Sequence, residues 1–300
     1  MPLYLTEADV GDLLTPADAE RAVEESLRRI AAGEVEQPPR TRLQLGDGVF
    51  AVMPCVDRGL GLAGLKTYSW TPEGTPFLVV LFAGGEVEAI VEAERLGQLR
   101  TAAASAVAAR LLARDGATTV GILGCGRQAA SHIVALRAAL SIERALVYCP
   151  NARKLAAFCT EHGCVPAESH SEAAACDVVV TVTTSKDPVV RGEWLQPGAF
   201  VIAVGANDPS LRELDNVVLE RASFVCTDSR EQARVEAGDL IEPIERGVLD
   251  WLEVHELHDV VTGDLTGRAS DDDIVVFKSN GLAAWDLAVA ARVVELARDR

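Results

Sequence analysis

The sequence predicts an α/β fold in which a parallel, doubly wound sheet follows a smaller α+β part. From residue 118 to 278, short apolar runs alternate with segments of helical periodicity, which is typical of parallel strands joined by helices. Before residue 92, one helix is followed by short alternating runs around glycine turns, which indicates an antiparallel meander. A chain of 300 residues with 49% hydrophobic content is long enough for one or two such domains.

The first part is expected to hold one amphipathic helix, two hairpins and a second, alanine-rich helix. Thr15 is placed to cap the first helix, Pro16 occupies its first position and Gly33 is placed to end it. Glycine turns at 46–48 and 84–85 separate the strands of the two hairpins. The expected strands are 42–45, 49–53, 77–82 and 87–91, and the alanine-rich helix covers 92–114.

The second part is expected to alternate apolar strands with helices. Its predicted strands are 118–123, 144–149, 178–183, 200–204, 224–227 and 274–277. Helices are predicted at 128–140 and 153–162, and a last helix at 282–298.

Charge and composition exclude several classes of partner. The chain has 28 basic and 45 acidic residues, a net charge of −17, so most of its surface would repel nucleic acids and anionic membranes. An anionic substrate is still compatible, because a pocket can hold a few cations within an acidic shell. No run of about 18 uncharged apolar residues predicts a membrane span.

The cysteines and the N-terminus favour a cytoplasmic protein. The seven cysteines are scattered and odd in number, so we expect all of them to be reduced and mostly buried. The first residues lack the basic and apolar regions of a signal peptide. No metal site is expected, since His255 and His258 are three positions apart rather than the four of a zinc protease helix.

One loop carries the clearest chemical signal. The segment Gly124-Cys125-Gly126-Arg127-Gln128-Ala129 lies between a predicted strand and a predicted helix. Gly124 allows a tight turn, Gly126 lets backbone amides approach a pyrophosphate, and Ala129 fits where the helix packs on the sheet. The helix N-terminus adds partial positive charge. The loop therefore predicts a dinucleotide cofactor.

The end of the second strand of this unit bears on which dinucleotide is bound. An acid there would hold the ribose hydroxyls of NAD, but the chain reads Tyr148-Cys149-Pro150-Asn151. Asn151, Arg153 and Lys154 favour the 2′-phosphate of NADP, with NAD as the alternative. Arg153 and Lys154 can equally be solvated residues of a first helical turn.

Several short motifs, in their order along nearly the whole chain, resemble the ornithine cyclodeaminase and mu-crystallin family. Besides the loop, these are Gln37–Arg40, Met53-Pro54, Gly64–Lys66, Leu99–Ser105, Val204–Ala206, Arg212–Asp215, Val276–Gly281 and Trp285-Asp286. The resemblance implies a homodimer of two-domain chains. Residues 1–113 and 279–300 would form a substrate-binding and dimerisation domain, and 114–278 a Rossmann-type dinucleotide-binding domain.

The resemblance also implies the site. Arg40 and Arg100 would bind the carboxylate of a small imino or amino acid, and Lys66 would exchange a proton at the reacting centre with a lowered pKa. The candidate cofactor-binding residues come from three sources: positions that match cofactor contacts of the family, the glycines of the loop, and the end of the second strand. They are Thr101, Gly124, Gly126, Arg127, Gln128, Asn151, Arg153, Thr183, Val204 and Ser279.

Asn207 decides between branches of the family. True cyclodeaminases carry a catalytic aspartate there, and an amide cannot act as a general base, although a one-residue shift would bring in Asp208. We therefore expect an NAD(P)-dependent imine reductase or amino acid dehydrogenase, with Lys66 and Asn207 as its candidate catalytic residues. The alternatives are a cyclodeaminase-type ammonia lyase using NAD, and an NADPH-bound binding protein of the mu-crystallin type.

Overall fold

The computed structural model describes residues 2–72 and 74–300, and these form two compact units. Unit 1 runs to Ala104 and resumes from Gly281 to Arg300, while unit 2 comprises Ser105–Asn280. The boundaries expected from the sequence were 113/114 and 278/279. The division at residue 104 falls inside one helix, α3 (Glu94–Leu112), which therefore contributes to both units.

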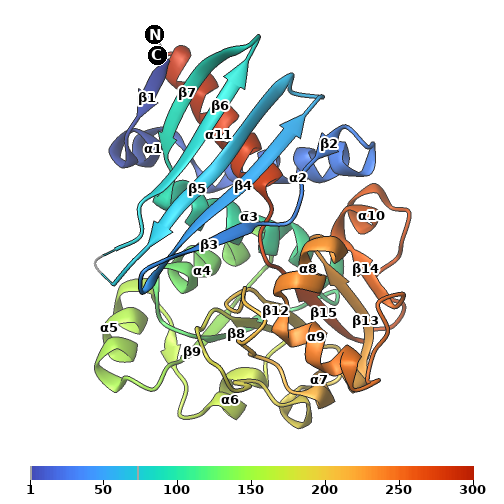
Figure 1. Ribbon diagram of the computed structural model, residues 1–300. Coiled ribbons are helices and arrows are strands. Elements are labelled where there is room, and N and C mark those ends of the chain that lie inside the picture. Colours follow the sequence, from blue (N-terminus) through green and yellow to red (C-terminus); the bar gives the residue numbers. More distant parts are fainter. Residues whose placement is uncertain (1, 73) are drawn as a thin grey trace. The chain divides into compact units, whose positions relative to one another are not determined.

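Unit 1 contains a seven-stranded sheet with the order β1-β7-β6-β5-β4-β2, and β3 pairs with β4 (Figure 1). Both predicted hairpins are confirmed, as β3/β4 and β6/β7, and β1 adds to β7 in parallel. Strands β1, β2 and β5 were not identified from the sequence. The bounds are β1 (Leu3–Leu5), β2 (Val35–Glu36), β3 (Thr41–Leu45), β4 (Gly48–Asp57), β5 (Leu62–Trp70), β6 (Phe77–Ala83) and β7 (Glu86–Glu92).

The helices of unit 1 include the last helix of the chain. Helix α2 (Pro16–Ala31) begins as predicted, with the Thr15 hydroxyl accepting from the backbone N–H of Asp18. Helix α1 (Glu7–Leu13) precedes it. Helix α11 (Ala283–Arg298) packs against α2 and against β4, β5 and β6, and its residues 283–290 are all buried. A helix so fully enclosed can place a charged side chain in the interior of unit 1.

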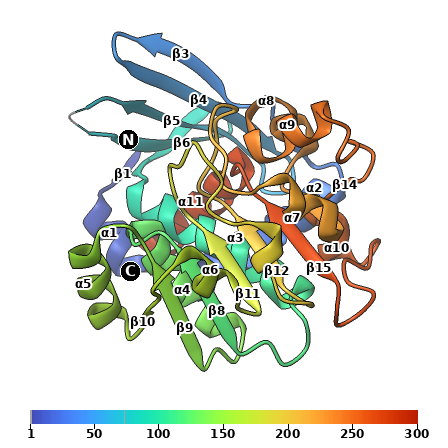
Figure 2. The same ribbon diagram turned by 90° about the horizontal axis from the view of Figure 1, so that it is seen from below.

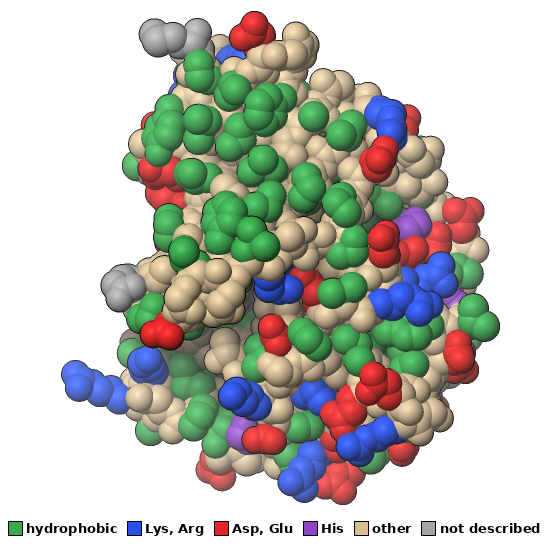
Figure 3. Space-filling model, viewed as in Figure 1, with side chains coloured by type: hydrophobic (Ala, Val, Ile, Leu, Met, Phe, Trp, Pro, Cys, Tyr) green, Lys and Arg blue, Asp and Glu red, His purple; other side chains and the backbone are tan. Residues whose placement is uncertain are grey.

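The outer face of the unit 1 sheet is unusually apolar. Along β4, Ala51 and Met53 point into the core, whereas the alternating positions Phe50, Pro54 and Val56 are partly exposed. An antiparallel sheet with one solvated face normally alternates apolar and polar residues. Figure 3 shows hydrophobic side chains gathered over this sheet, so both faces of β4 are suited to burial.

Unit 2 contains the predicted parallel, doubly wound sheet, with the order β10-β9-β8-β11-β12-β15-β13-β14 (Figure 2). The order reverses at β8, which pairs with β9 on one side and β11 on the other. Ligands bind beyond the carboxyl ends of the strands at such a point. The strands are β8 (Thr119–Leu123), β9 (Arg144–Tyr148), β10 (Val165–Pro166), β11 (Val178–Thr181), β12 (Phe200–Ala203), β13 (Ala222–Thr227), β14 (Val254–Glu256) and β15 (Ile274–Lys278).

The helices of unit 2 connect these strands. The predicted helices are confirmed as α4 (Arg127–Ala139) and α5 (Ala152–His162). Besides strands β10 and β14, the sequence pattern did not reveal the short helical elements α6 (His170–Ala174), η1 (Gly192–Trp194), α7 (Asn216–Arg221), α8 (Arg230–Glu236), α9 (Gly238–Glu245) and α10 (Leu257–Thr262). Within the described part of the chain, no helix has the length and apolar character needed to cross a bilayer.

Candidate active site

A buried cluster of charges in unit 1 contains Lys66 from β5, Arg100 from α3 and Asp286 from α11. Asp286 Oδ1 accepts from Lys66 Nζ at 2.8 Å and from Arg100 Nε at 3.0 Å. The three residues are 4%, 7% and 0% exposed. One carboxylate therefore faces two cations in a water-poor environment, which leaves excess positive charge for an anion.

Arg40 belongs to the same cluster. It lies between β2 and β3, is 7% exposed, and its Nε and Nη1 donate to Met53 Sδ at 3.2 Å and Tyr68 Oη at 3.3 Å. Its charge also contributes to lowering the pKa of Lys66. The structure thus brings together the three cationic residues, Arg40, Lys66 and Arg100, that the sequence predicted as a site.

The electrostatics of the cluster suit a lysine that exchanges protons. Burial lowers the pKa of Lys66 to about 8, Asp286 opposes that shift, and the charge of Arg100 adds to it. Burial alone would raise the pKa of Asp286, but Arg100 and Lys66 hold it below its usual value. Lys66 can therefore exist in both protonation states near neutral pH while Asp286 stays ionised.

Asp286 is a functional candidate that the sequence reasoning missed. It was noted only as part of a family motif, yet it is the first acid inside an otherwise apolar helix segment, and a buried acid needs a partner. Its second oxygen, Oδ2, has no hydrogen-bond partner among residues 2–72 and 74–300. That oxygen can accept from a further donor.

Two glycines allow the cluster to pack. Gly281 has a φ of +80°, and a Cβ there would lie 2.5 Å from Arg100 Nη1. A Cβ on Gly97 would lie 3.4 Å from Lys66 Nζ. A larger residue at position 281 would therefore displace the guanidinium that is the candidate carboxylate ligand.

The predicted nucleotide loop of unit 2 has the backbone geometry that its glycines imply. Gly124 has a φ of +120°, and its N–H donates to the carbonyl of Tyr148 at 2.9 Å. Gly126 is the N-cap of α4 without a side-chain cap, and a Cβ added to it would meet nothing within 4 Å. The free space at an uncapped helix N-terminus fits a pyrophosphate.

Glu213 organises the loops that follow β11 and β12. This fully buried carboxylate accepts from the backbone and hydroxyl of Thr183 and from the N–H groups of Gly205 and Ala206, at 2.7–3.0 Å. Burial raises its pKa. The sequence motif that contains Glu213 was noted, but the role of Glu213 was not predicted, because its hydrogen-bond partners are distant from it along the chain.

Lys278 and Asp239 form a second buried pair beside this network. Lys278 Nζ lies 3.2 Å from Asp239 Oδ2 and donates to the carbonyl of Ala206. Asp239 Oδ1 accepts from the backbone N–H groups of Glu213 and Leu214. The loop that carries Val204 and Asn207 is therefore supported by buried charges at its start.

The other predicted cofactor residues occupy defined positions. The hydroxyls of Thr101 and Ser279 donate to Gly97 O and Asp228 Oδ2, at 2.7 and 2.9 Å. The Asn151 side chain caps α5 by accepting from Lys154 N. Arg127 and Arg153 are exposed, and the buried Oε1 of Gln128 has no hydrogen-bond partner within the described ranges.

Asn207 and Asp208 differ in their surroundings. Asn207 is exposed, whereas Asp208 Oδ1 accepts from the backbone N–H of Ser210 at 2.9 Å and its hydroxyl at 2.6 Å. The Asp208 carboxylate thus stabilises its own turn. A one-residue shift of the alignment would make Asp208, rather than Asn207, the match to the catalytic aspartate of cyclodeaminases. In the structure its carboxylate instead has a structural role in the turn.

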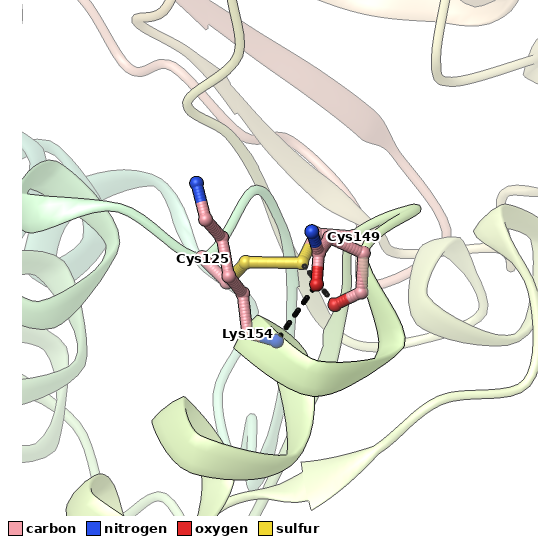
Figure 4. Close-up of a disulfide and its surroundings, with 4 residues drawn as sticks. Cys125, Cys149 and Lys154 are labelled. Atoms are coloured by element: carbon pink, nitrogen blue, oxygen red, sulfur yellow. Dashed lines mark hydrogen bonds between the residues drawn. A yellow bond between two sulfur atoms is a disulfide. The ribbon is translucent and has the colours of Figure 1, made fainter.

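The expectation that every cysteine is a reduced thiol is wrong. Cys125 of the nucleotide loop and Cys149, which follows β9, form a disulfide across 24 residues (Figure 4). The pairing arises because β8 and β9 are neighbours, so the residues just beyond their carboxyl ends meet. The remaining five cysteines, Cys55, Cys159, Cys164, Cys176 and Cys226, are unpaired.

Comparison with known proteins identifies the family. The ornithine cyclodeaminase/mu-crystallin family matches residues 2–300. This chain belongs to that family. An alanine dehydrogenase of Archaeoglobus fulgidus is 35% identical, over 98% of this chain and 94% of its own length.

Solved structures of relatives have the same fold. The Thermococcus litoralis Δ1-pyrroline-2-carboxylate reductase in complex with NADH and L-proline matches with a TM-score of 0.93 and 29% identity, over 99% of this chain and 98% of that one. A dimeric archaeal alanine dehydrogenase with bound NAD matches with a TM-score of 0.93 and 34% identity, over 99% and 96%. Both relatives carry a nicotinamide dinucleotide.

Proposed function

We propose that this protein is an NAD(P)-dependent oxidoreductase that reduces a small α-imino acid to the amino acid, or catalyses the reverse oxidation. The observation that carries the proposal is the buried Lys66, whose pKa of about 8 is set by burial beside Arg100 and Arg40. Solved structures of a reductase and a dehydrogenase among the relatives contain bound NADH or NAD.

Arg40 and Arg100 bind the substrate carboxylate in this proposal. A planar guanidinium matches a carboxylate with two parallel hydrogen bonds. Arg100 uses its Nε for Asp286, so its terminal nitrogens are the groups that would hold the substrate. The excess positive charge of the cluster compensates the charge that the substrate brings.

Lys66 exchanges the proton at the substrate nitrogen. The nicotinamide supplies or accepts the hydride at the α-carbon. In reduction, protonated Lys66 gives its proton to the nitrogen, and in oxidation neutral Lys66 takes one. Asp286 is a positioning residue, because it holds the Lys66 ammonium and the Arg100 guanidinium on one oxygen.

NADP is the proposed cofactor, with NAD as the alternative. The chain beyond β9 carries no acid up to Lys154, and Arg153 is exposed where a 2′-phosphate could be met. Kd values of NADPH and NADH, measured by fluorescence, decide between them. If Arg153→Ala raises the Kd of NADPH more than the Kd of NADH, the result supports NADP as the cofactor.

A second copy of the chain is the proposed partner of the apolar sheet face. This face includes a groove lined by Pro38, Pro54, Val56, Leu65 and Phe82. One relative, the archaeal alanine dehydrogenase, is a dimer. We expect a homodimer by light scattering and a monomer for the Val56→Glu, Phe82→Glu variant; a dimeric variant contradicts this assignment of the interface.

Turnover is the direct test. Purified protein is mixed with NADPH or NADH and a cyclic ketimine such as pyrroline-2-carboxylate, and cofactor oxidation is followed. Amino acids with NADP or NAD test the reverse direction. Ammonia released from ornithine or lysine without net change in the cofactor would favour a cyclodeaminase, and tight cofactor binding without any turnover would favour a binding protein.

A further inference from the structure

The Cys125–Cys149 disulfide joins the two segments that would flank a bound dinucleotide. Cys125 lies between Gly124 and Gly126, and Cys149 is the first residue after β9. We propose that this disulfide is a thiol-exchange site for a small dithiol reductant, and that its redox state sets the affinity of the nucleotide. The inference rests on the proposed function only in that the loop binds the cofactor.

The reaction balances with the reductant named. A thiolate of the dithiol attacks Cys125 Sγ, the S–S bond breaks and Cys149 leaves as a thiolate that takes a proton. The second thiol of the reductant then closes its own disulfide and releases Cys125. Two electrons pass to the protein, and the reductant leaves as a cyclic disulfide.

The local structure favours exchange at this pair. Cys125 is half-buried, whereas Cys149 is 8% exposed, so Cys125 is the more accessible residue of the pair for a small reductant. The carbonyl of Asn151 lies 3.6 Å from Cys149 Sγ, where it can accept from the thiol once the bond is broken.

Three buried, unpaired cysteines are poor competitors for such chemistry. Burial raises the pKa of Cys55 to about 12 and that of Cys176 to about 11, and it raises the pKa of Cys226 as well. The thiolate is the form that reacts, so these buried side chains are inert near neutral pH. These three thiols therefore do not compete with the disulfide at the nucleotide loop.

The bond should favour nucleotide binding. In the disulfide form the Gly126 position is open and α4 is uncapped, so the loop already has a geometry that fits a pyrophosphate. The cross-link limits the movement of the loop relative to β9, and a preorganised site loses less freedom on binding. Nucleotide binding and disulfide reduction are linked equilibria. If the disulfide raises nucleotide affinity by some factor, bound nucleotide must lower the equilibrium constant for reduction of the disulfide by the same factor.

The test measures both sides of this linkage on the full chain. NADPH and NADH affinities are determined by fluorescence after equilibration in oxidised and reduced dithiothreitol, with the disulfide followed by intact mass under non-reducing conditions. We expect about fivefold weaker binding after reduction, and about a fivefold higher ratio of reduced to oxidised dithiothreitol at the midpoint when nucleotide is saturating.

Variants separate the pair from general effects of reduction. Cys125→Ser and Cys149→Ser should bind nucleotide like the reduced chain and lose their response to dithiothreitol. Cys164→Ser, a half-buried unpaired cysteine of the same unit, is the matched control and should respond like the original chain.

Each contrary outcome has a distinct meaning. Failure of the disulfide to form under oxidising conditions overturns the inference, and so does equal nucleotide affinity in the two redox states. Neither result affects the proposed function, because binding persists. If neither nucleotide binds in either state, the proposed function fails together with the inference.

Discussion

The charge cluster of unit 1 is formed by side chains, whereas the nucleotide loop of unit 2 is formed by the backbone. The cluster consists of side chains at least nine-tenths buried, held by one carboxylate, Asp286. The loop consists of backbone, shaped by the positive φ of Gly124 and the open space at Gly126. The first site should therefore be sensitive to a change of charge, and the second to the addition of a single carbon atom.

Removing the Lys66 ammonium tests the cluster most severely. Lys66→Met should lower kcat/KM about 10²–10⁴-fold, the usual contribution of a positioned proton donor or acceptor. Nucleotide affinity, measured by fluorescence, should not change. The control is Arg21→Met, which removes an exposed cation of the same unit. An active Lys66→Met enzyme would falsify the catalytic assignment.

Neutralising Asp286 tests whether the cluster is also a structural element. Asp286→Asn leaves two buried cations without their shared counter-charge, so the free energy of unfolding should fall by about 3–5 kcal/mol. Urea denaturation measures this change. Glu295→Gln, on the exposed side of the same helix, should cost less than about 1 kcal/mol. Equal losses for the two variants would contradict the role given to Asp286.

Adding one methyl group to the loop tests the other site. Gly126→Ala places a Cβ where the protein has no neighbour, so the free energy of unfolding should fall by less than about 1 kcal/mol, the effect of alanine at an N-cap, while NAD(P)H binds about tenfold more weakly. Gly11→Ala, also without neighbours, is the control in unit 1: because Gly11 lies inside α1, it should stabilise the fold by about 0.5–1 kcal/mol and leave nucleotide affinity unchanged. Unchanged nucleotide affinity for Gly126→Ala would remove the loop from the proposed site.

The smallest expected effect is the pH dependence of the cluster. The pKa of Lys66 is about 8, so the lysine is protonated below that pH and neutral above it. kcat/KM for imine reduction, which needs the proton, should fall as pH rises through about 8. The same parameter for amino acid oxidation should rise over that range. Parallel profiles in the two directions would exclude Lys66 as the proton carrier.

The sequence predicted the features that depend on local pattern. The two hairpins of unit 1, the alternation of unit 2 and the start of α2 at Thr15 follow from residue periodicity, turn glycines and caps, which act over a few positions. The cationic residues Arg40, Lys66 and Arg100 were identified through a family resemblance. The proximity of Lys66 and Arg100 follows from their shared hydrogen bonds to Asp286 of α11.

The features that the sequence did not predict depend on contacts between distant positions. Asp286 meets Arg100 across 186 residues, and Glu213 binds Thr183 across 30. Cys125 and Cys149 have no distinctive spacing, and their pairing follows only from the parallel register of β8 and β9. Periodicity shows which face of an element is buried, but it does not show what that face will meet.

Because α11 is the last helix of the chain, unit 1 cannot be completed until the ribosome has synthesised nearly all residues. Lys66 and Arg100 are synthesised first, then all of unit 2, and only afterwards the helix that carries Asp286. During that interval the nascent sheet lacks both its covering helix and the anion that neutralises its cations. All of unit 2 is therefore synthesised before unit 1 is complete. Until α11 is added, the apolar sheet face that it covers is exposed, and this is the stage at which we expect the nascent chain to be most prone to aggregation.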